Sequence, residues 1–131
     1  MGNIIQDLLS MFGFSNALAS DFPPDISTNR QLLDELRKHG ANFNKLHPLE
    51  HHFLCTSQEF LKELMKKGES IGYKSAKFGE GDSEDIKYWY GDLIKETQLN
   101  LSIINSENSL MLRLACEFKA NYDGWGTPII K

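Results

Sequence analysis

The stretch LHPLEHHFLCTSQE, which covers Leu46–Glu59, decides the fold, because a strand pattern in it passes directly into a helix start. We interpret Leu46–Cys55 as a strand, with Pro48 near its start or on a sheet edge, since proline cannot donate a ladder hydrogen bond. Thr56 and Glu59 then form a capping box, in which each side chain accepts the backbone N–H of the other residue at the start of the helix. The stretch therefore predicts a strand followed at once by a helix.

The residues after this stretch predict two more strands, a second helix and a final strand. The first helix ends at Gly72, where the apolar face of the preceding residues stops. The expected elements are a strand at Tyr73–Phe78, a turn at Gly79–Ser83, a strand from Ile86 with a bulge at Gly91 and renewed pairing over Leu93–Leu99, a helix at Glu107–Lys119 and a strand at Tyr122–Ile130.

The residues before this stretch predict one further helix. The paired prolines in Asp21–Asp25 indicate a linker, Thr28 or Asn29 is expected to cap the helix, and Gly40 to end it. The order of elements is that of a ferredoxin-like α+β fold (βαββαβ), with two helices on one face of an antiparallel sheet and the other face left for the N-terminal segment or a partner. We expect residues 1–27 to be an apolar helical segment and linker, and residues 28–131 to be the domain.

Composition limits the possible functions. The chain has 131 residues, 40% of them hydrophobic, and a formal net charge of −4. Such a chain forms one domain with a core, and it lacks the basic stripe expected of a protein that binds nucleic acid directly. Cys55 and Cys116 fit no zinc spacing and are expected to be reduced thiols of a cytoplasmic protein, with one long-range disulfide as the alternative.

The N-terminal run Met1–Phe14 is apolar, with Asp7 as its only charge. It is too short to span a bilayer and lacks the basic region of a signal peptide, so we expect no membrane span. A short helix docked on the domain or on a partner chain, and hence a possible homodimer contact, is the favoured interpretation over a helix lying on a membrane surface, because no Lys or Arg precedes Arg30.

His47–His51 matches the H-x-x-E-H zinc signature, which requires a helix. On a strand, His47 and His51 share a face but lie about 13 Å apart, too far for one ion. We therefore expect no metal and no cofactor. Nucleophile elbows, P-loops and GxGxxG motifs are also absent from the sequence, so we expect no catalysis.

Two segments are candidates for binding a partner protein. In the first, Glu50 and His52 are expected on one sheet face and His51 on the other. These residues either contact a partner, or the histidines pair with buried polar groups and Glu50 orients them. The second is Tyr122-Asp123-Gly124-Trp125-Gly126-Thr127, in which Asp123-Gly124 is a turn or bulge pair and the glycines indicate positive φ or close approach. Trp125 and Tyr122 suit an interface, and Trp125 equally suits a place closing the core.

Several segments together resemble the regulator of ribonuclease E activity B (RraB) family. They are Leu36-x-x-x-Gly40, Glu50-His51-His52, Gly72-Tyr73, Glu96–Asn100, the helix with Leu112-x-Leu114-Ala115-x-x-Phe118, and Tyr122–Thr127, so the resemblance covers about residues 32–128. It implies a ferredoxin-like fold, no known cofactor, and a non-catalytic role in binding and inhibiting ribonuclease E.

Two features of the chain depart from the family pattern. The best-known members are strongly acidic with an Asp/Glu-rich tail, whereas this chain ends at Lys131 with a net charge of only −4. Lower charge gives weaker electrostatic steering toward a basic partner. The alternative function is therefore a protein-binding or self-associating module of the same fold with a different target.

Overall fold

A computed structural model describes residues 26–131, so the expectations for residues 1–25, including the dimer contact, lie outside its description. Within that range the chain order is α3 (Ile26–Lys38), β1 (His47–Cys55), α4 (Gln58–Ser70), β2 (Lys74–Ser83), β3 (Ile86–Thr97), α5 (Leu101–Glu117) and β4 (Asn121–Gly126). None of these helices is long and apolar enough to cross a membrane.

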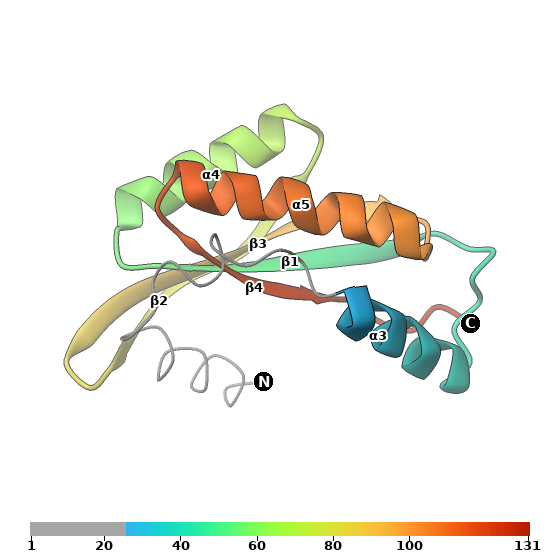
Figure 1. Ribbon diagram of the computed structural model, residues 1–131. Helices are drawn as coiled ribbons and strands as arrows, with labels where there is room; N and C mark the ends of the chain where they lie inside the picture. The colour runs from blue at the N-terminus through green and yellow to red at the C-terminus, as the bar shows by residue number, and fades with distance from the viewer. Residues whose placement is uncertain (1–25) are drawn as a thin grey trace.

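The four strands form one antiparallel sheet in the order β2-β3-β1-β4. This order confirms the predicted ferredoxin-like α+β fold. Figure 1 shows α4 and α5 side by side over one face of the sheet, while α3 lies beyond the end of β4, near the C-terminus. We call the face under α4 and α5 the helix face and the opposite one the open face.

The core lies between the helix face and the two helices. Alternate residues of β1 point into it, among them Leu49, His51 and Phe53, which are at most 1% exposed. Phe53 packs in a cluster with apolar side chains of the two helices and of β3, including Leu61, Leu64, Leu93, Met111 and Leu114. Because β1 occupies a central position in the sheet, its side chains on the open face are held on a rigid support.

Two helix starts differ from prediction. The N-cap of α4 is Ser57 rather than Thr56: its Oγ accepts the backbone N–H of Phe60 at 3.2 Å. Helix α5 begins six residues before Glu107, at Leu101, where Oδ1 of Asn100 accepts the N–H of Ile103 at 3.2 Å. The polar residues of the first turns of α5 concealed this start, because serine and asparagine lower helix propensity.

The first helix and the last strand also have other bounds. Helix α3 begins at Ile26, so Thr28 and Asn29 lie inside it. Gly40 follows the end of the helix, as predicted, and has a φ of +92°. Strand β4 stops at Gly126 and not at Ile130. The N–H of Ile130 instead donates to Nε2 of His47 at 3.1 Å, so the chain end is tied to the start of β1.

The predicted turn at Gly79–Ser83 is wrong, because these residues belong to β2 and the hairpin turns at Glu84 and Asp85, both at positive φ. The glycines serve another purpose. A Cβ at Gly79 would lie 2.5 Å from the phenolic oxygen of Tyr90, and one at Gly81 would stand equally close to that of Tyr88. The two tyrosine rings therefore lie across the glycines of the edge strand, as aromatic residues do beside strand glycines elsewhere.

The predicted bulge at Gly91 is also misplaced. Strand β3 pairs with β1 without interruption past Gly91, and the irregularity lies on β2 between Ala76 and Gly79. Lys77, inside that irregularity, has a φ of 55°. The bulge thus sits on the edge strand, where an extra residue disrupts the fewest ladder bonds.

Candidate functional site

The segment Glu50–Phe53 divides between the two faces of the sheet. Glu50 and His52 lie on the open face, whereas His51 and Phe53 are buried on the helix face, as the alternation along a strand predicted. His47 is buried as well: Nδ1 contacts the carbonyl of Lys45 at 3.1 Å and Nε2 accepts from Ile130. Since this segment is a strand, the helical geometry of the zinc signature is not met.

His51 is enclosed between β1 and α5. Its Nδ1 lies 2.8 Å from the hydroxyl of Tyr122, and its Nε2 lies 3.4 Å from Oε1 of Glu107, too loosely aligned for a regular hydrogen bond. Burial lowers the pKa of His51, although Glu107 opposes the shift. We therefore assign a neutral ring that carries its proton on Nε2, facing the carboxylate, and accepts the Tyr122 hydroxyl at Nδ1.

The carboxylate of Glu107 is the second polar group in this buried region. It accepts the hydroxyl of Tyr73 at 2.5 Å. Burial acts to raise the pKa of Glu107, but the contacts with His51 and Tyr73 outweigh it and hold the pKa below its usual value. Burial, together with the neighbouring carboxylate, raises the pKa of Tyr73. The carboxylate of Glu107 is thus ionised and faces the neutral side chains of Tyr73 and His51. These contacts fix α5 against β1 and the start of β2.

A chain of hydrogen bonds extends this buried group to α3. Nδ2 of Asn108 donates to the Tyr122 hydroxyl at 3.0 Å, and Nδ2 of Asn29 donates to Oδ1 of Asn108 at 2.8 Å and to Oδ1 of Asn105 at 2.7 Å. The indole Nε1–H of Trp125 donates to Oδ1 of Asn29 at 3.0 Å. We call the connected residues the buried polar network: His51, Tyr73, Glu107, Asn108, Tyr122, Asn29, Trp125 and the partly buried Asn105.

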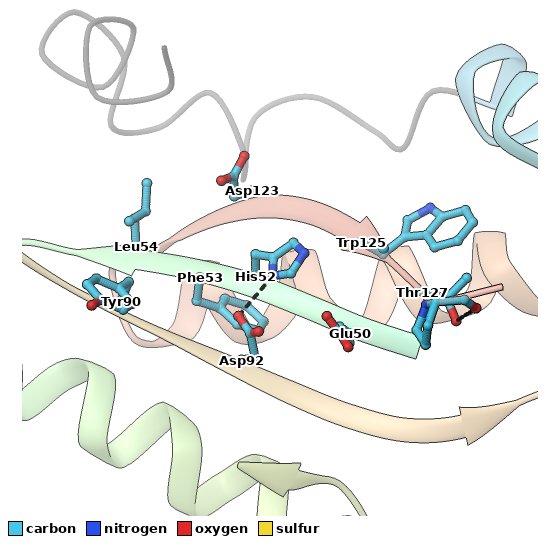
Figure 2. Close-up of a pocket in the computed structure, with 11 residues that line it drawn as sticks. Glu50, His52, Phe53, Leu54, Tyr90, Asp92, Asp123, Trp125 and Thr127 are labelled. Carbon is cyan, nitrogen blue, oxygen red and sulfur yellow. Dashed lines mark hydrogen bonds and ion pairs between the residues drawn. The ribbon is translucent and has the colours of Figure 1, made fainter. Parts of the chain in front are cut away.

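The predicted bulge pair Asp123-Gly124 is confirmed. Between His51 and Phe53 the register shifts, so that Asp123 and Gly124 both stand opposite His52, and Gly124 has a φ of +92°. A bulge of this kind changes the direction of the side chains beside it. Here it lets Tyr122 contact His51 on the helix face while Asp123 points toward the open face, where Figure 2 shows it on the same side as His52.

On the open face, His52 pairs with Asp92. Nδ1 of His52 lies 2.8 Å from Oδ1 of Asp92, and this hydrogen bond raises the pKa of His52. Nζ of Lys77 lies 3.4 Å from Oε1 of Glu50 and 3.9 Å from Oδ2 of Asp92. These pairs join β1, β2 and β3 across the sheet, although Lys77 is more than half exposed and its ion pairs are correspondingly weak.

Asp123 is the carboxylate left over on this face. Burial raises its pKa to about 7; the nearby His52 opposes the shift and Asp92 adds to it. Between residues 28 and 131 the Asp123 side chain has no hydrogen-bond or ion-pair partner. The carboxyl group of Asp123 thus lies in a poorly solvated place, where the charge of His52 offsets the effect of burial only in part.

These side chains surround a cavity of about 500 Å³ on the open face (Figure 2). Its polar lining comes from Glu50, His52, Asp92 and Asp123, and its apolar lining includes Leu54 and Tyr90. The segment from Trp125 to Pro128 closes one end. A concave, mostly apolar site with a few convergent polar groups is the usual form of a binding pocket.

The six predicted contact residues therefore form two sets. Glu50, His52, Asp123 and Trp125 line the cavity, whereas His51 and Tyr122 belong to the helix-face side of the buried polar network. Trp125 also packs against the apolar cluster of Leu33, Leu49, Leu99 and Ile104, which confirms its predicted place closing the core, while its contact with a partner stays a prediction.

Sequence reasoning missed three polar members of the site, namely Asn29, Asp92 and Asn108. A signal existed for Asn108: it is buried in the stripe Ile104, Asn108, Met111 and Ala115, whose other members are apolar. A polar residue in such a stripe indicates a buried hydrogen-bond partner. Asp92 follows the alternation of β3 onto the open face, but only the register shows that it faces His52.

Fold and cavity together define a class of protein: a small ferredoxin-like α+β domain with one face closed by helices and an acidic cavity on the other. Comparison with known proteins gives the family. The family model described as "Regulator of ribonuclease activity B" (RraB) matches residues 27–127, and the chain belongs to this family. The resemblance that the sequence motifs indicated is thereby confirmed.

Curated relatives named "Regulator of ribonuclease activity B" come from several bacteria. The chain is 29% identical over 100 residues to the relative from Pseudoalteromonas translucida, and this match covers 76% of this chain and 90% of the relative. It is 28% identical over 104 residues to the relative from Escherichia coli, and this match covers 75% of this chain and 72% of the relative. The relative from Haemophilus ducreyi is 30% identical over 98 residues, spanning 74% and 68%. The family takes its name from the regulation of ribonuclease activity.

Proposed function

We propose that this chain is a non-catalytic, cytoplasmic regulator of ribonuclease E, which it binds through a protein surface and thereby inhibits. The observation that carries this proposal is the family match over residues 27–127, supported by relatives named as regulators of ribonuclease activity. Inhibition by contact requires only a surface that fits the nuclease, and no reaction chemistry on this chain.

The open face is the surface we assign to the partner. Glu50, His52, Asp123 and Trp125 come together there around the cavity, and the helices α4 and α5 cover the opposite face. Partly exposed aromatic and polar side chains around a concavity are typical of interface centres. His51 and Tyr122 are assigned a supporting role, since they hold β1, β4 and α5 together beneath this surface.

A pull-down and an RNA-cleavage assay with ribonuclease E of the same bacterium test the proposal. We expect the full chain to bind the nuclease at micromolar concentration or below and to slow cleavage of its RNA substrates. No binding in that range would refute the proposal. If sedimentation then showed a concentration-dependent dimer, the result would favour the self-associating alternative.

A pair of charge reversals tests the assigned surface. Glu50→Lys places a cation at the cavity rim, whereas Glu63→Lys makes the same change on the exposed side of α4. We expect Glu50→Lys to weaken binding by about ten-fold or more, because juxtaposed like charges at an interface cost several kcal/mol. Glu63→Lys should bind as the wild type does; equal effects of both changes would contradict the assignment to the open face.

A further inference from the structure

The cavity on the open face contains more negative than positive groups. Asp92 is paired with His52 at 2.8 Å, and Glu50 has a long contact of 3.4 Å with the exposed Lys77. Asp123 has neither a hydrogen bond nor an ion pair within the described part of the chain. Three carboxylates thus face one lysine at the rim and one histidine. The lysine and the histidine pair with Glu50 and Asp92, so the carboxylate of Asp123 remains as an acceptor without a partner in the described part of the chain.

The remaining lining favours one kind of cation. Leu54, Tyr90 and Pro128 supply apolar and aromatic surface beside the carboxylates. An arginine guanidinium is planar, weakly hydrated and able to stack on an aromatic ring while its N–H groups donate to a carboxylate. A lysine ammonium is a compact, strongly hydrated charge and is less suited to a cavity of this composition.

We propose that the cavity receives an arginine side chain of the bound protein, with Asp123 as the main acceptor of its guanidinium and the apolar lining around Leu54 as the surface against which its plane packs. This inference rests on the proposed function for the identity of the partner, but the chemistry of the anchor is a separate claim. The volume of about 500 Å³ leaves room for the side chain together with part of the segment that carries it.

Binding of the arginine is coupled to the protonation of Asp123. In the free chain the pKa of Asp123 is about 7, so near neutrality the group is partly protonated. A bound guanidinium favours the ionised carboxylate, and binding therefore releases a proton at neutral or lower pH. His52 acts in the same direction, because loss of its charge at higher pH removes a repulsion of the bound guanidinium. Glu50, Asp92 and Lys77 are the other charged groups around Asp123 and His52.

An NMR titration tests the anchor chemistry without the nuclease. The full chain is titrated with N-acetyl-arginine amide, with the lysine analogue, and with N-acetyl-citrulline amide, which keeps the shape of arginine but lacks the charge. We expect arginine to shift the signals of His52, Asp123 and the Trp125 indole most, lysine less and citrulline not at all. Equal shifts by citrulline, or no shifts by arginine, would overturn the inference. The same shifts on raising the protein concentration alone would also overturn it, because they would indicate a second copy of the chain as the occupant.

A second arm uses ribonuclease E and separates the two claims. Asp123→Asn should weaken binding about ten-fold at pH 8 and leave only the pH dependence that His52 contributes. The wild type should lose about ten-fold in affinity in total as the pH falls through 7 and Asp123 takes up its proton. Asp82→Asn, the same change at an exposed position of β2, is the control. Binding that Asp123→Asn leaves unchanged would overturn the arginine anchor alone. A nuclease that fails to bind the wild type would overturn the proposed function, while the NMR result still decides the anchor.

Discussion

The indole Nε1–H of Trp125 on β4 donates to Oδ1 of Asn29 on α3, at 3.0 Å and across 96 residues of chain. Asn29 in turn donates both hydrogens of its amide to Asn105 and Asn108 on α5. Every polar atom of the Asn29 side chain is therefore engaged, at a residue that is 4% exposed. This one side chain fixes the position of α3 against the sheet edge that borders the cavity.

Asn29→Ala should destabilise the chain by about 1–3 kcal/mol, the cost of leaving buried donors and acceptors without partners. The indole of Trp125 and the amides of Asn105 and Asn108 each lose a partner in this variant. Urea denaturation measures the change in the free energy of unfolding. Gln31→Ala, on the exposed side of the same helix, is the matched control and should change it little; equal losses for both variants would show that the network does not hold α3.

Gly68→Ala should also destabilise the fold, although alanine is the better helix former. Gly68 lies in α4 directly over Leu93, and an added Cβ would stand 2.6 Å from one methyl carbon of that fully buried side chain. Overpacking costs about 1–3 kcal/mol, which exceeds the roughly 1 kcal/mol of helix propensity gained. Thermal unfolding of Gly68→Ala against Lys66→Ala, an exposed site of the same helix, measures the net effect, and a raised midpoint for Gly68→Ala would contradict the packing.

The two adjacent histidines should give opposite pH dependences of stability. The pKa of His51 is lowered by burial, so the unfolded chain binds its proton more readily, and stability is lost as pH falls below about 6.5. The pKa of His52 is raised by Asp92, so its contribution is present below that pH and is lost as pH rises through the raised value.

His52→Gln removes the His52 contribution and leaves that of His51 in place. We expect the free energy of unfolding of this variant to fall more steeply than that of the wild type as pH is lowered toward about 6.5, because the gain from His52 over that range is gone. Denaturation curves at several pH values measure the slope. His39→Gln, which removes an exposed histidine at the end of α3, should leave the wild-type slope unchanged. A shallower slope in His52→Gln would contradict the assigned charge states.

The order of the elements was predictable because it depends on local patterns. Alternation in β1 and β3, the apolar stripe of α4 and the glycine at the end of α3 are each visible within a dozen residues. The error at Gly79–Ser83 has its cause in another strand, whereas the late start predicted for α5 came from the serine and asparagine residues of its first turns. Glycine and serine are favoured in turns, but here Gly79 makes room for Tyr90, a residue of another strand, and only the pairing shows it.

The sheet faces of the candidate site residues on β1 were predictable, but the contacts that these residues make were not. Alternation placed Glu50 and His52 on one face, and the sequence contains the bulge pair that turns Asp123 to the same side. The contacts of His52 with Asp92 and of Trp125 with Asn29 depend on register and on the docking of α3, both of which are set by the whole fold. A pattern read along the chain contains neither.

Asp123→Asn should raise the stability of the free chain while it weakens binding. The pKa of Asp123 is raised in the fold, to about 7 from a usual value of 3.8, so its contribution to stability is present below pH 3.8 and is lost as pH rises through 7. Asparagine cannot ionise. The advantage of the variant over the wild type should therefore grow between pH 4 and pH 7 and become constant above pH 7.

Denaturation of both proteins across this range measures the gap, and Asp82→Asn, at an exposed site, should show none. A carboxylate that is unfavourable in the free chain and favourable in a complex is the trade-off expected of a binding residue. If Asp123→Asn were less stable than the wild type at pH 8, Asp123 would instead have a structural partner within the chain, and its assignment to the bound protein would fail.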